Sequence, residues 1–288
     1  MNNVPLISVV MPSYNQGHFI EEAITSVLGQ DYPHKELIVM DGGSTDETVE
    51  VLRRYDRHLA YWQSTKDGGQ ANAINLGFQR ARGQVLCWLN SDDMYLPCAL
   101  TKVMRAIGDV QRPALVFGGC LHFTEGAVNG FAALPDRFER ERLTYADDYD
   151  QPSTFWTRAL WEQTGPLDES YHFIFDWDWF IRASRICDFT RLGAYLSIYR
   201  AHSSHKTGTG GDRRQQEVMR LTRQYADAHW RGVYEDVAVV AARLRQDQEK
   251  LNRFRVPRLR YLLYRKLYAR HGANAVETAL NMLRPSSV

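Results

Sequence analysis

Acidic and amide side chains occur in four short clusters, each at or shortly after the end of an apolar run that predicts a β-strand. The clusters are Pro12-Ser13-Tyr14-Asn15, Asp41-Gly42-Gly43-Ser44-Thr45-Asp46, Asp67-Gly68-Gly69-Gln70 and Asn90-Ser91-Asp92-Asp93. In an open α/β sheet the carboxyl ends of parallel strands share one edge, and ligands bind at that edge. Helix N-termini at the same edge favour anions. The spacing therefore predicts a crevice that binds a nucleotide diphosphate.

The adjacent carboxylates of Asp92 and Asp93 suggest metal chemistry. Such a pair can hold a hard divalent cation, which keeps some of its waters and takes its other ligands from phosphate oxygens. A cation there would neutralise a leaving diphosphate. The alternative is that Asn90-Ser91-Asp92-Asp93 is only a turn and a helix cap before Leu96, because such strings are common where a strand leads into a helix. Taken alone, this string supports both interpretations about equally.

The elements expected to position these clusters alternate between strand and helix patterns, which is typical of βαβ units and a mainly parallel sheet. We predict strands over residues 7–11, 36–40, 59–63, 84–89, 114–117 and 194–199. The apolar periodicity predicts helices over 19–28, 71–81 and 96–107, and from residue 213 to the end with a break at Pro257. Ser44 and Glu47 have the spacing of a capping box, which predicts a helix start there. Residues 131–150 have no clear assignment.

The ordered set of motifs resembles the inverting family 2 glycosyltransferases, which have a GT-A fold. The resemblance is carried by PSYNQ, ELIVMDGGSTD, DGGQANAINLG and WLNSDD, and it covers roughly residues 5 to 205. It implies that Asp41 bonds the nucleobase, that Asp92 and Asp93 are the DXD-type pair, and that Asp93 contacts a Mn²⁺ or Mg²⁺ ion directly. The other residues that it places around the nucleotide-sugar are Pro12, Ser13, Tyr14, Asn15, Asp67, Gly69, Gln70, Asn72 and Ser91.

Two positions depart from the family pattern. Asn90 stands where many members have the first Asp of a DxDD string, and Ile74 stands where many have an Arg. The first change leaves Asp92 and Asp93 as the carboxylates available to a metal. The second means that a cationic contact to the nucleotide must come from elsewhere in the chain.

An inverting transfer needs a base that deprotonates the acceptor hydroxyl. Phe175-Asp176-Trp177-Asp178-Trp179 resembles the family element that supplies it, with Asp176 as the base. Its aromatic surroundings should raise the pKa of that carboxyl. We assign the acceptor to Trp177 and Trp156, with Asp178 as a helper or a structural residue. The alternative is that Asp176 caps a helix over residues 177–184 and that the tryptophans belong to the core.

A polar segment follows the last predicted strand. Tyr199-Arg200-Ala201-His202 resembles the Y-R-x-H end of the family's catalytic domain, and a Gly- and Ser-rich stretch that should be mobile comes next. His202 is a candidate metal or diphosphate ligand, although a lone histidine is as often structural. Arg200, His205 and Lys206 are expected to close over the diphosphate and exclude water.

The net charge of +1 conceals an uneven distribution. Residues 253–270 contain seven Lys or Arg and no acid, so subtracting these seven charges from +1 leaves −6 on the other 270 residues. The basic segment 253–270 is interspersed with Leu, Tyr and Phe. This composition suits an anionic membrane surface or, equally, a helix packed on the domain with solvated charges. The acidic remainder and the lack of a recognised motif argue against nucleic-acid binding.

The sequence shows no long apolar span and no basic N-terminal leader, so we expect a cytoplasmic protein, peripheral to the inner face of the membrane if the basic segment binds there. Cys87, Cys98, Cys120 and Cys187 are scattered, and we expect reduced core residues. We expect a GT-A catalytic domain over 1–212, with a nucleotide-binding half (1–118) and an acceptor-binding half (119–212). A helical extension follows over 213–288.

The predicted activity is transfer of a sugar from a UDP-, GDP- or dTDP-linked donor to a hydroxyl of a glycan or lipid-linked acceptor. One alternative is a sugar-nucleotide nucleotidyltransferase, which is expected to carry a Gly-rich, cationic loop after the first strand. Residues 12–17 read PSYNQG and contain no cation. The other alternative is a carbohydrate-binding descendant of the fold that has lost catalysis.

Overall fold

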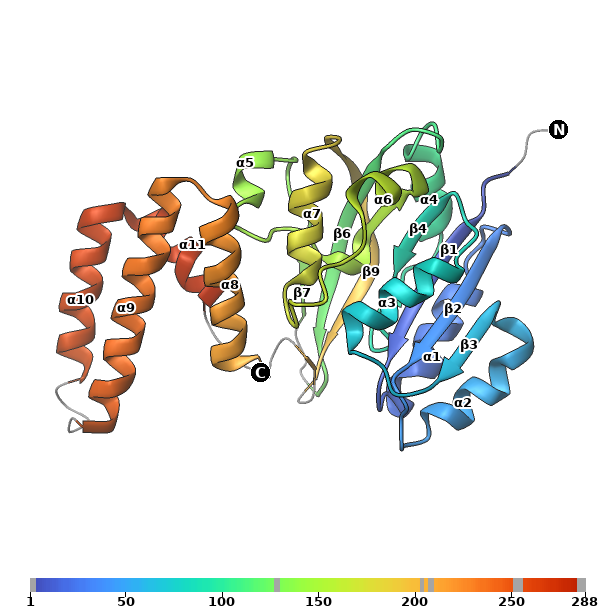
Figure 1. Cartoon of the computed structure of the whole chain (residues 1–288), viewed down its shortest axis with the longest axis horizontal. Helices are drawn as coiled ribbons and strands as arrows, with labels where there is room; N and C mark the ends of the chain where they lie inside the picture. Colours follow the sequence, from blue (N-terminus) through green and yellow to red (C-terminus); the bar gives the residue numbers. More distant parts are fainter. Residues whose placement is uncertain (1–3, 127–129, 203–204, 207–209, 251–255, 284–288) are drawn as a thin grey trace. The chain divides into compact units, whose positions relative to one another are not determined.

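A computed structural model describes residues 4–126, 130–202, 205–206, 210–250 and 256–283, with side chains left undescribed over 244–262. The chain divides into two compact units (Figure 1). The first comprises Met1–Arg140 and Asp148–Ser203, and the second comprises Glu141–Asp147 and Ser204–Val288. The stretch that the sequence left unassigned therefore contributes residues to both units. The predicted division into nucleotide-binding and acceptor-binding halves stays a prediction.

The first unit contains a nine-stranded mixed sheet in the order β3-β2-β1-β4-β8-β6-β9-β5, with β7 paired to β6. Strands β1 to β4 run parallel, while β8 runs antiparallel to both β4 and β6. Parallel pairing places the carboxyl ends of β1 to β4 on one edge, as the sequence predicts. The strands are β1 (Ile7–Ser13), β2 (Lys35–Asp41), β3 (Tyr61–Ser64), β4 (Val85–Trp88), β5 (Met94–Tyr95), β6 (Leu115–Thr124), β7 (Gly130–Ala133), β8 (Thr154–Thr157) and β9 (Phe189–Ala201).

The central strands carry apolar residues on both faces of the sheet, so helices cover both faces. On one face, Ile7, Val9 and Met11 of β1 belong to one apolar cluster with residues of α1 (Gly17–Leu28), α2 (Thr48–Tyr55) and α4 (Ala99–Ala106). On the other face α3 (Gln70–Arg80) lies against β1 and β2, with Gly77 packed directly on Val10. The remaining helices of this unit are η1 (Asp56–His58), η2 (Gln151–Ser153), α6 (Arg158–Thr164) and α7 (Phe175–Ser184), while α5 (Arg140–Leu143) begins at the end of its first segment.

A buried carboxylate ties the first two strands to the turn before β4. Glu36 on β2 accepts hydrogen bonds from the Ser8 hydroxyl at 2.6 Å and the Arg82 backbone N–H at 2.7 Å, and it pairs with the Arg82 guanidinium at 2.8 Å. Burial would raise the pKa of Glu36, but these donors together hold it below its ordinary value. The ionised form therefore contributes to the stability of the sheet.

The second unit is helical. It contains α8 (Gly211–Tyr225), α9 (Ala228–Lys250), α10 (Val256–His271) and α11 (Ala273–Leu283), with α9 in contact with each of the other three. Pro257 lies in the first turn of α10, where its missing N–H costs nothing. None of the helices described is both long and apolar enough to span a bilayer. Within the basic segment 253–270, Arg253 and Arg255 lie outside the described residues.

Several local predictions were wrong. Ser44 does not cap a helix: its hydroxyl binds Asp41, and α2 begins at Thr48, whose N–H is accepted by Asp46. Cys98 is exposed at the start of α4, whereas Cys87 and Cys120 are buried and Cys187 is half-buried. The strands predicted over 114–117 and 194–199 are each longer, because β6 and β9 pair with each other along most of their length.

Candidate active site

Asp41 organises the loop that follows β2. Its carboxylate accepts hydrogen bonds from the Ser44 hydroxyl at 2.5 Å, the Ser64 hydroxyl at 2.6 Å and the Ser44 N–H at 2.9 Å, with Gly43 N–H at 3.2 Å. The residue is buried at the end of its strand. A carboxylate has room for about four such donors. Three of these donors bond Oδ2 and only the Ser44 hydroxyl bonds Oδ1, so Oδ1 keeps a lone pair for the base contact predicted for Asp41.

The loop after β1 is bound to the loop after β2. Asn15 has a left-handed backbone (φ 51°); its N–H donates to the Ser44 hydroxyl at 2.7 Å, and its side-chain oxygen accepts from Thr45 N–H at 2.9 Å. A side chain at Gly42 would stand 3.4 Å from both the Tyr14 ring and the Asp67 carboxylate. Two predicted nucleotide-binding residues, Tyr14 and Asp67, therefore both lie close to Gly42. Tyr14 is exposed, which leaves its ring open to a ligand, and the Ser13 hydroxyl is buried without a hydrogen-bond partner.

A chain of hydrogen bonds leads from the loop before α3 to the acidic pair. Asp67 accepts from Gly69 N–H at 2.7 Å, and Gln70 donates to Asn90 at 2.8 Å. Asn90 in turn donates to Asp93 at 3.2 Å. Asn90, where many family members have an Asp, therefore acts as a neutral bridge between Gln70 and Asp93. Burial and the charge of Asp41 raise the pKa of Asp67, in spite of the Gly69 hydrogen bond.

Asp93 of the acidic pair is buried and Asp92 is half-buried, and the two carboxylates repel each other. Asp93 lies 1% exposed and accepts Arg200 N–H at 3.1 Å, while Asp92 lies 3.1 Å from the imidazole Nε2 of His202. Burial raises the pKa of Asp93 well above its ordinary value, and the charge of neighbouring Asp92 raises it further. An uncompensated carboxylate beside a second one is a suitable place for a divalent cation. The two carboxylates therefore fit the metal role predicted for them.

The potential ligand atoms of Asp92, Asp93 and His202, the three residues proposed as metal ligands, are not all within 4.8 Å of one another. Among the described residues, the one set of three metal-ligand side chains that does converge is Cys120, His122 and Asp150. His202 is buried against the Phe19 ring at 4.5 Å, and its Nε2 faces Asp92. Its observed contacts orient Asp92, and metal ligation by His202 stays a prediction.

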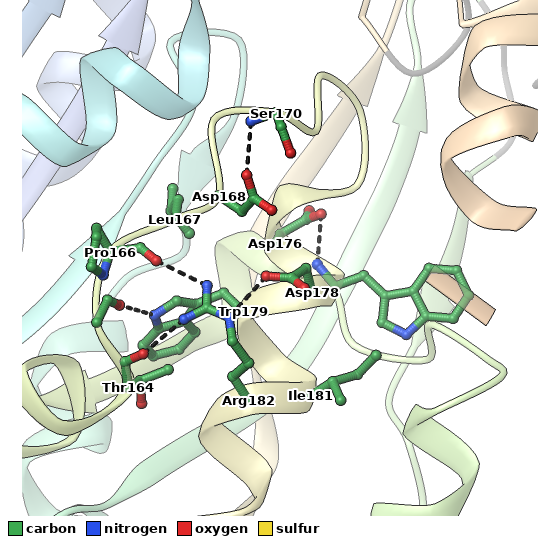
Figure 2. Close-up of polar contacts among 12 residues, drawn as sticks. Thr164, Pro166, Leu167, Asp168, Ser170, Asp176, Asp178, Trp179, Ile181 and Arg182 are labelled. Atoms are coloured by element: carbon green, nitrogen blue, oxygen red, sulfur yellow. Dashed lines mark hydrogen bonds and ion pairs between the residues drawn. The ribbon is translucent and has the colours of Figure 1, made fainter. Parts of the chain in front are cut away.

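Asp176 stands in the first turn of α7, half-buried, and accepts the N–H of Trp177 at 2.8 Å (Figure 2). The helix start expected at residue 177 is two residues late, since α7 begins at Phe175. Asp178 is buried and binds Arg182 at 2.9 Å, and Arg182 also donates to the backbone oxygens of Thr164 and Pro166. Figure 2 shows the two carboxylates leaving the helix in different directions. The contacts of Asp178 are those of a structural residue.

The tryptophans assigned to the acceptor are core residues. Trp156 and Trp177 are each 0% exposed. Trp156 packs at 4.7 Å from Trp179 and 5.4 Å from Trp88. A fully buried ring has no face left for a sugar, so this packing would have to open for either ring to meet the acceptor. The acceptor contact of both residues stays a prediction. The aromatic richness of residues 171–180 reflects packing of α7 against the sheet.

Arg200, His205 and Lys206 are the cationic residues expected at the diphosphate. The Arg200 guanidinium pairs with Glu22 on α1 and lies over the Phe19 ring at 5.0 Å. It is committed to α1 and would have to leave Glu22 to reach a diphosphate. His205 and Lys206 belong to the second unit, and their part in closing the site stays a prediction.

Sequence reasoning missed Glu169. It accepts the side-chain amides of Asn75 at 2.9 Å and Asn72 at 3.1 Å, and thereby fixes the predicted nucleotide-sugar ligand Asn72. The partners lie more than 90 residues away in sequence. The available signal was an unexplained acid in the turn Leu167-Asp168-Glu169-Ser170, shortly before Asp176.

Comparison with known proteins decides the family. The model named "Glycosyl transferase family 2" matches residues 8–157, which is 150 of the 288 residues. The chain belongs to glycosyl transferase family 2. The match spans β1 to β8 and therefore includes the strand-end loops and the acidic pair.

Three similar proteins illustrate the range of this glycosyltransferase family. The putative teichuronic acid biosynthesis glycosyltransferase TuaG of Bacillus subtilis is 39% identical over 149 residues, covering 50% of this chain and 56% of TuaG. S. aureus TarS 1-349 in complex with UDP-GlcNAc has a TM-score of 0.58 at 18% identity, covering 97% of this chain and 82% of that structure. The mannosyltransferase PcManGT of Pyrobaculum calidifontis, in complex with GDP-Man and Mn2+, has a TM-score of 0.54 at 19% identity, covering 98% and 74%.

The two solved structures show the shared GT-A fold, and with the family match they establish that this chain is a glycosyltransferase. One TarS structure is longer, and the chain covers 55% of it. The match to TuaG spans about half of each protein.

Proposed function

We propose that this glycosyltransferase moves a sugar, with inversion, from a nucleotide-diphosphate donor to a hydroxyl of a glycan or lipid-linked acceptor in cell-surface polysaccharide synthesis. The observation that carries the proposal is the set of hydrogen bonds that joins the ends of β1, β2 and β3 to one another and Gln70 to Asn90 and Asp93. TarS with UDP-GlcNAc and PcManGT with GDP-Man support the donor class. TuaG, named for putative teichuronic acid biosynthesis, supports the acceptor class.

The donor side is assigned residue by residue. Exposed Tyr14 and half-buried Asp67, which both lie beside Gly42, would line the nucleotide pocket. Asp92 and Asp93 would hold Mn²⁺ or Mg²⁺, which supplies positive charge against the leaving diphosphate. Asn90 and Arg200 N–H would keep Asp93 oriented toward that cation. The structural neighbour with Mn2+ supports the kind of metal.

We assign the base to Asp176. Its position at the start of α7 leaves one carboxylate oxygen bound to Trp177 N–H, which orients the group. The base must take a proton from the acceptor hydroxyl as that oxygen attacks the anomeric carbon and the nucleotide leaves from the opposite face. Asp178 differs, because it is committed to Arg182. We therefore expect the two aspartates of the same helix to respond very differently to substitution.

The test is donor turnover by Asp176→Asn. The substitution should retain Mn²⁺-dependent binding of the nucleotide-sugar and lower transfer by about 10² to 10⁴-fold, the usual contribution of a general base. Nucleotide release from a panel of UDP-, GDP- and dTDP-sugars, with and without Mn²⁺, measures turnover. Anomeric NMR of the product reports inversion. Asp188→Asn, an exposed aspartate just beyond the end of α7, is the matched control and should keep parental activity.

Three outcomes would contradict the proposal. Parental turnover by Asp176→Asn would remove the base assignment, and retention at the anomeric carbon would remove the inverting mechanism. Donor binding without turnover across the panel would favour a carbohydrate-binding descendant of the fold.

A further inference from the structure

Three potential metal ligands converge where β6 approaches η2. Cys120 and His122 are two residues apart on β6 and so lie on one face of the strand, and Asp150 directly precedes η2. The Cys120 Sγ, a His122 ring nitrogen and an Asp150 carboxylate oxygen all lie within 4.8 Å of one another. His122 Nε2 is 2.9 Å from Asp150 Oδ1. A sulfur, a nitrogen and an oxygen atom that can each bind a metal ion thus lie close together.

The surroundings hold these groups in place. The His122 ring stacks on Phe131 with centroids 4.3 Å apart and planes 7° apart. Among the described residues, none forms a hydrogen bond with its buried Nε2 atom, although Asp150 is near. The Ser197 hydroxyl donates to Cys120 Sγ at 3.3 Å and lies 2.6 Å from the Ser153 hydroxyl. Hydrogen bonds to ligand atoms of this kind orient them and tune metal affinity.

The local electrostatics also favour a cation. Burial raises the pKa of the Cys120 thiol to about 12, and the charge of Asp150 adds to that effect. The cluster therefore lies in a region where negative charge is poorly compensated. A bound divalent ion would stabilise the thiolate and relieve this repulsion.

We propose that Cys120, His122 and Asp150 form a zinc-class metal site separate from the Asp92–Asp93 pair. Binding replaces the Cys120 S–H bond with a metal–sulfur bond and releases that proton to solvent. Mixed sulfur, nitrogen and oxygen ligands select Zn²⁺ or Co²⁺ over Mn²⁺ and Mg²⁺, which prefer oxygen. Tetrahedral ligands lie roughly 3.4 Å apart. Ligand atoms within 4.8 Å of one another therefore require only small side-chain adjustments, and a water would be the fourth ligand of a tetrahedral ion.

The test uses Co²⁺ as a spectroscopic probe of the full-length, chelator-treated protein without nucleotide. We expect about one equivalent of Co²⁺ to produce an intense thiolate-to-cobalt charge-transfer band in the near ultraviolet. Cys120→Ser should abolish the band, and Asp150→Asn should weaken Co²⁺ affinity by at least about tenfold while leaving the thiol in place. Competition with Zn²⁺ should erase the band, whereas equimolar Mn²⁺ should not.

Two controls separate this site from the others. Cys98→Ser removes an exposed thiol and should leave the band intact. Asp93→Asn removes an oxygen ligand of the proposed donor metal and should leave it intact as well, so the result does not depend on the donor assignment. Circular dichroism identifies any variant that fails to fold. No thiolate band in the parent protein, or an unchanged band in Cys120→Ser, would overturn the proposal.

Discussion

At the scale of single residues, Asp93 shows most clearly how a functional group can work against folding. Its folded pKa is raised, first by burial and then by Asp92. The metal-free folded state thus holds the Asp93 proton more tightly than the unfolded state does. The sign follows: the contribution of Asp93 to stability declines as pH rises above the ordinary range of an aspartate. Near neutral pH an ionised Asp93 is destabilising unless a cation is bound.

Asp93→Asn should therefore change stability in a pH-dependent way. Relative to the parent in a chelator, the variant should become more stable as pH rises from about 4 to 8, with its free energy of unfolding increasing by on the order of 1 kcal/mol. Urea melts at several pH values measure this, with Asp188→Asn as the exposed control. The variant should also lose the Mn²⁺-induced shift in Tm. A pH-independent difference would show that Asp93 is already compensated by its hydrogen bonds from Arg200 and Asn90.

The sequence predicted which residues would carry charge at the sheet edge, because strand-end position follows from local pattern alone. It could not predict how those side chains would be used. Trp156 and Trp177 looked available for a sugar, yet their burial depends on helices and strands that are distant in sequence. The Cys120, His122 and Asp150 cluster was missed for the same reason, since Asp150 joins the two β6 residues only through tertiary packing.

At the scale of elements, strand existence was predictable and exact limits were not. Apolar runs located β1, β2 and β4 to within a residue or two, whereas β6 and β9 extend because each supplies the other's hydrogen bonds. The capping box at Ser44 failed because Asp41 competes for the same hydroxyl. Asp46 instead accepts the N–H groups of Gly17 and Thr48, and so links the starts of α1 and α2. Where a side chain can form either a local capping contact or a hydrogen bond to a distant partner, the sequence motif alone does not predict which one forms.

Glu36→Gln tests the contact that ties β2 to β1 and to the turn before β4. The pKa of Glu36 is depressed overall, so its stabilising contribution is present above the unfolded pKa and is lost as pH falls through the folded pKa. The substitution should cost about 1–3 kcal/mol at neutral pH, with hydrogen bonds giving most of it because Arg82 is largely exposed. The difference should shrink below about pH 4. Glu50→Gln, on exposed α2 surface, should have little effect at any pH.

At the scale of the whole molecule, the remaining question is what the basic segment 253–270 does. We propose that it binds anionic membrane, which would bring a lipid-linked acceptor to the enzyme. The described side chains that bear on this are Arg265 and Lys266, both exposed on α10. Arg270 is less suitable because it pairs with Asp236 at 2.9 Å. Each cation near an anionic surface contributes about 1 kcal/mol, and salt screens the attraction.

Replacing Arg265 and Lys266 together by Gln should therefore lower partition onto phosphatidylserine-containing vesicles by about 2 kcal/mol, or roughly thirtyfold. Replacing exposed Arg53 and Arg57 by Gln changes the net charge equally at the other unit and should leave partition nearly unchanged. That comparison matters because general charge attraction would respond to both pairs alike. Equal losses, or sedimentation that ignores added salt, would show that α10 is not the membrane-binding element. A loss confined to the Arg265 and Lys266 variant would locate the contact on the segment that unbalances the charge of an otherwise acidic chain.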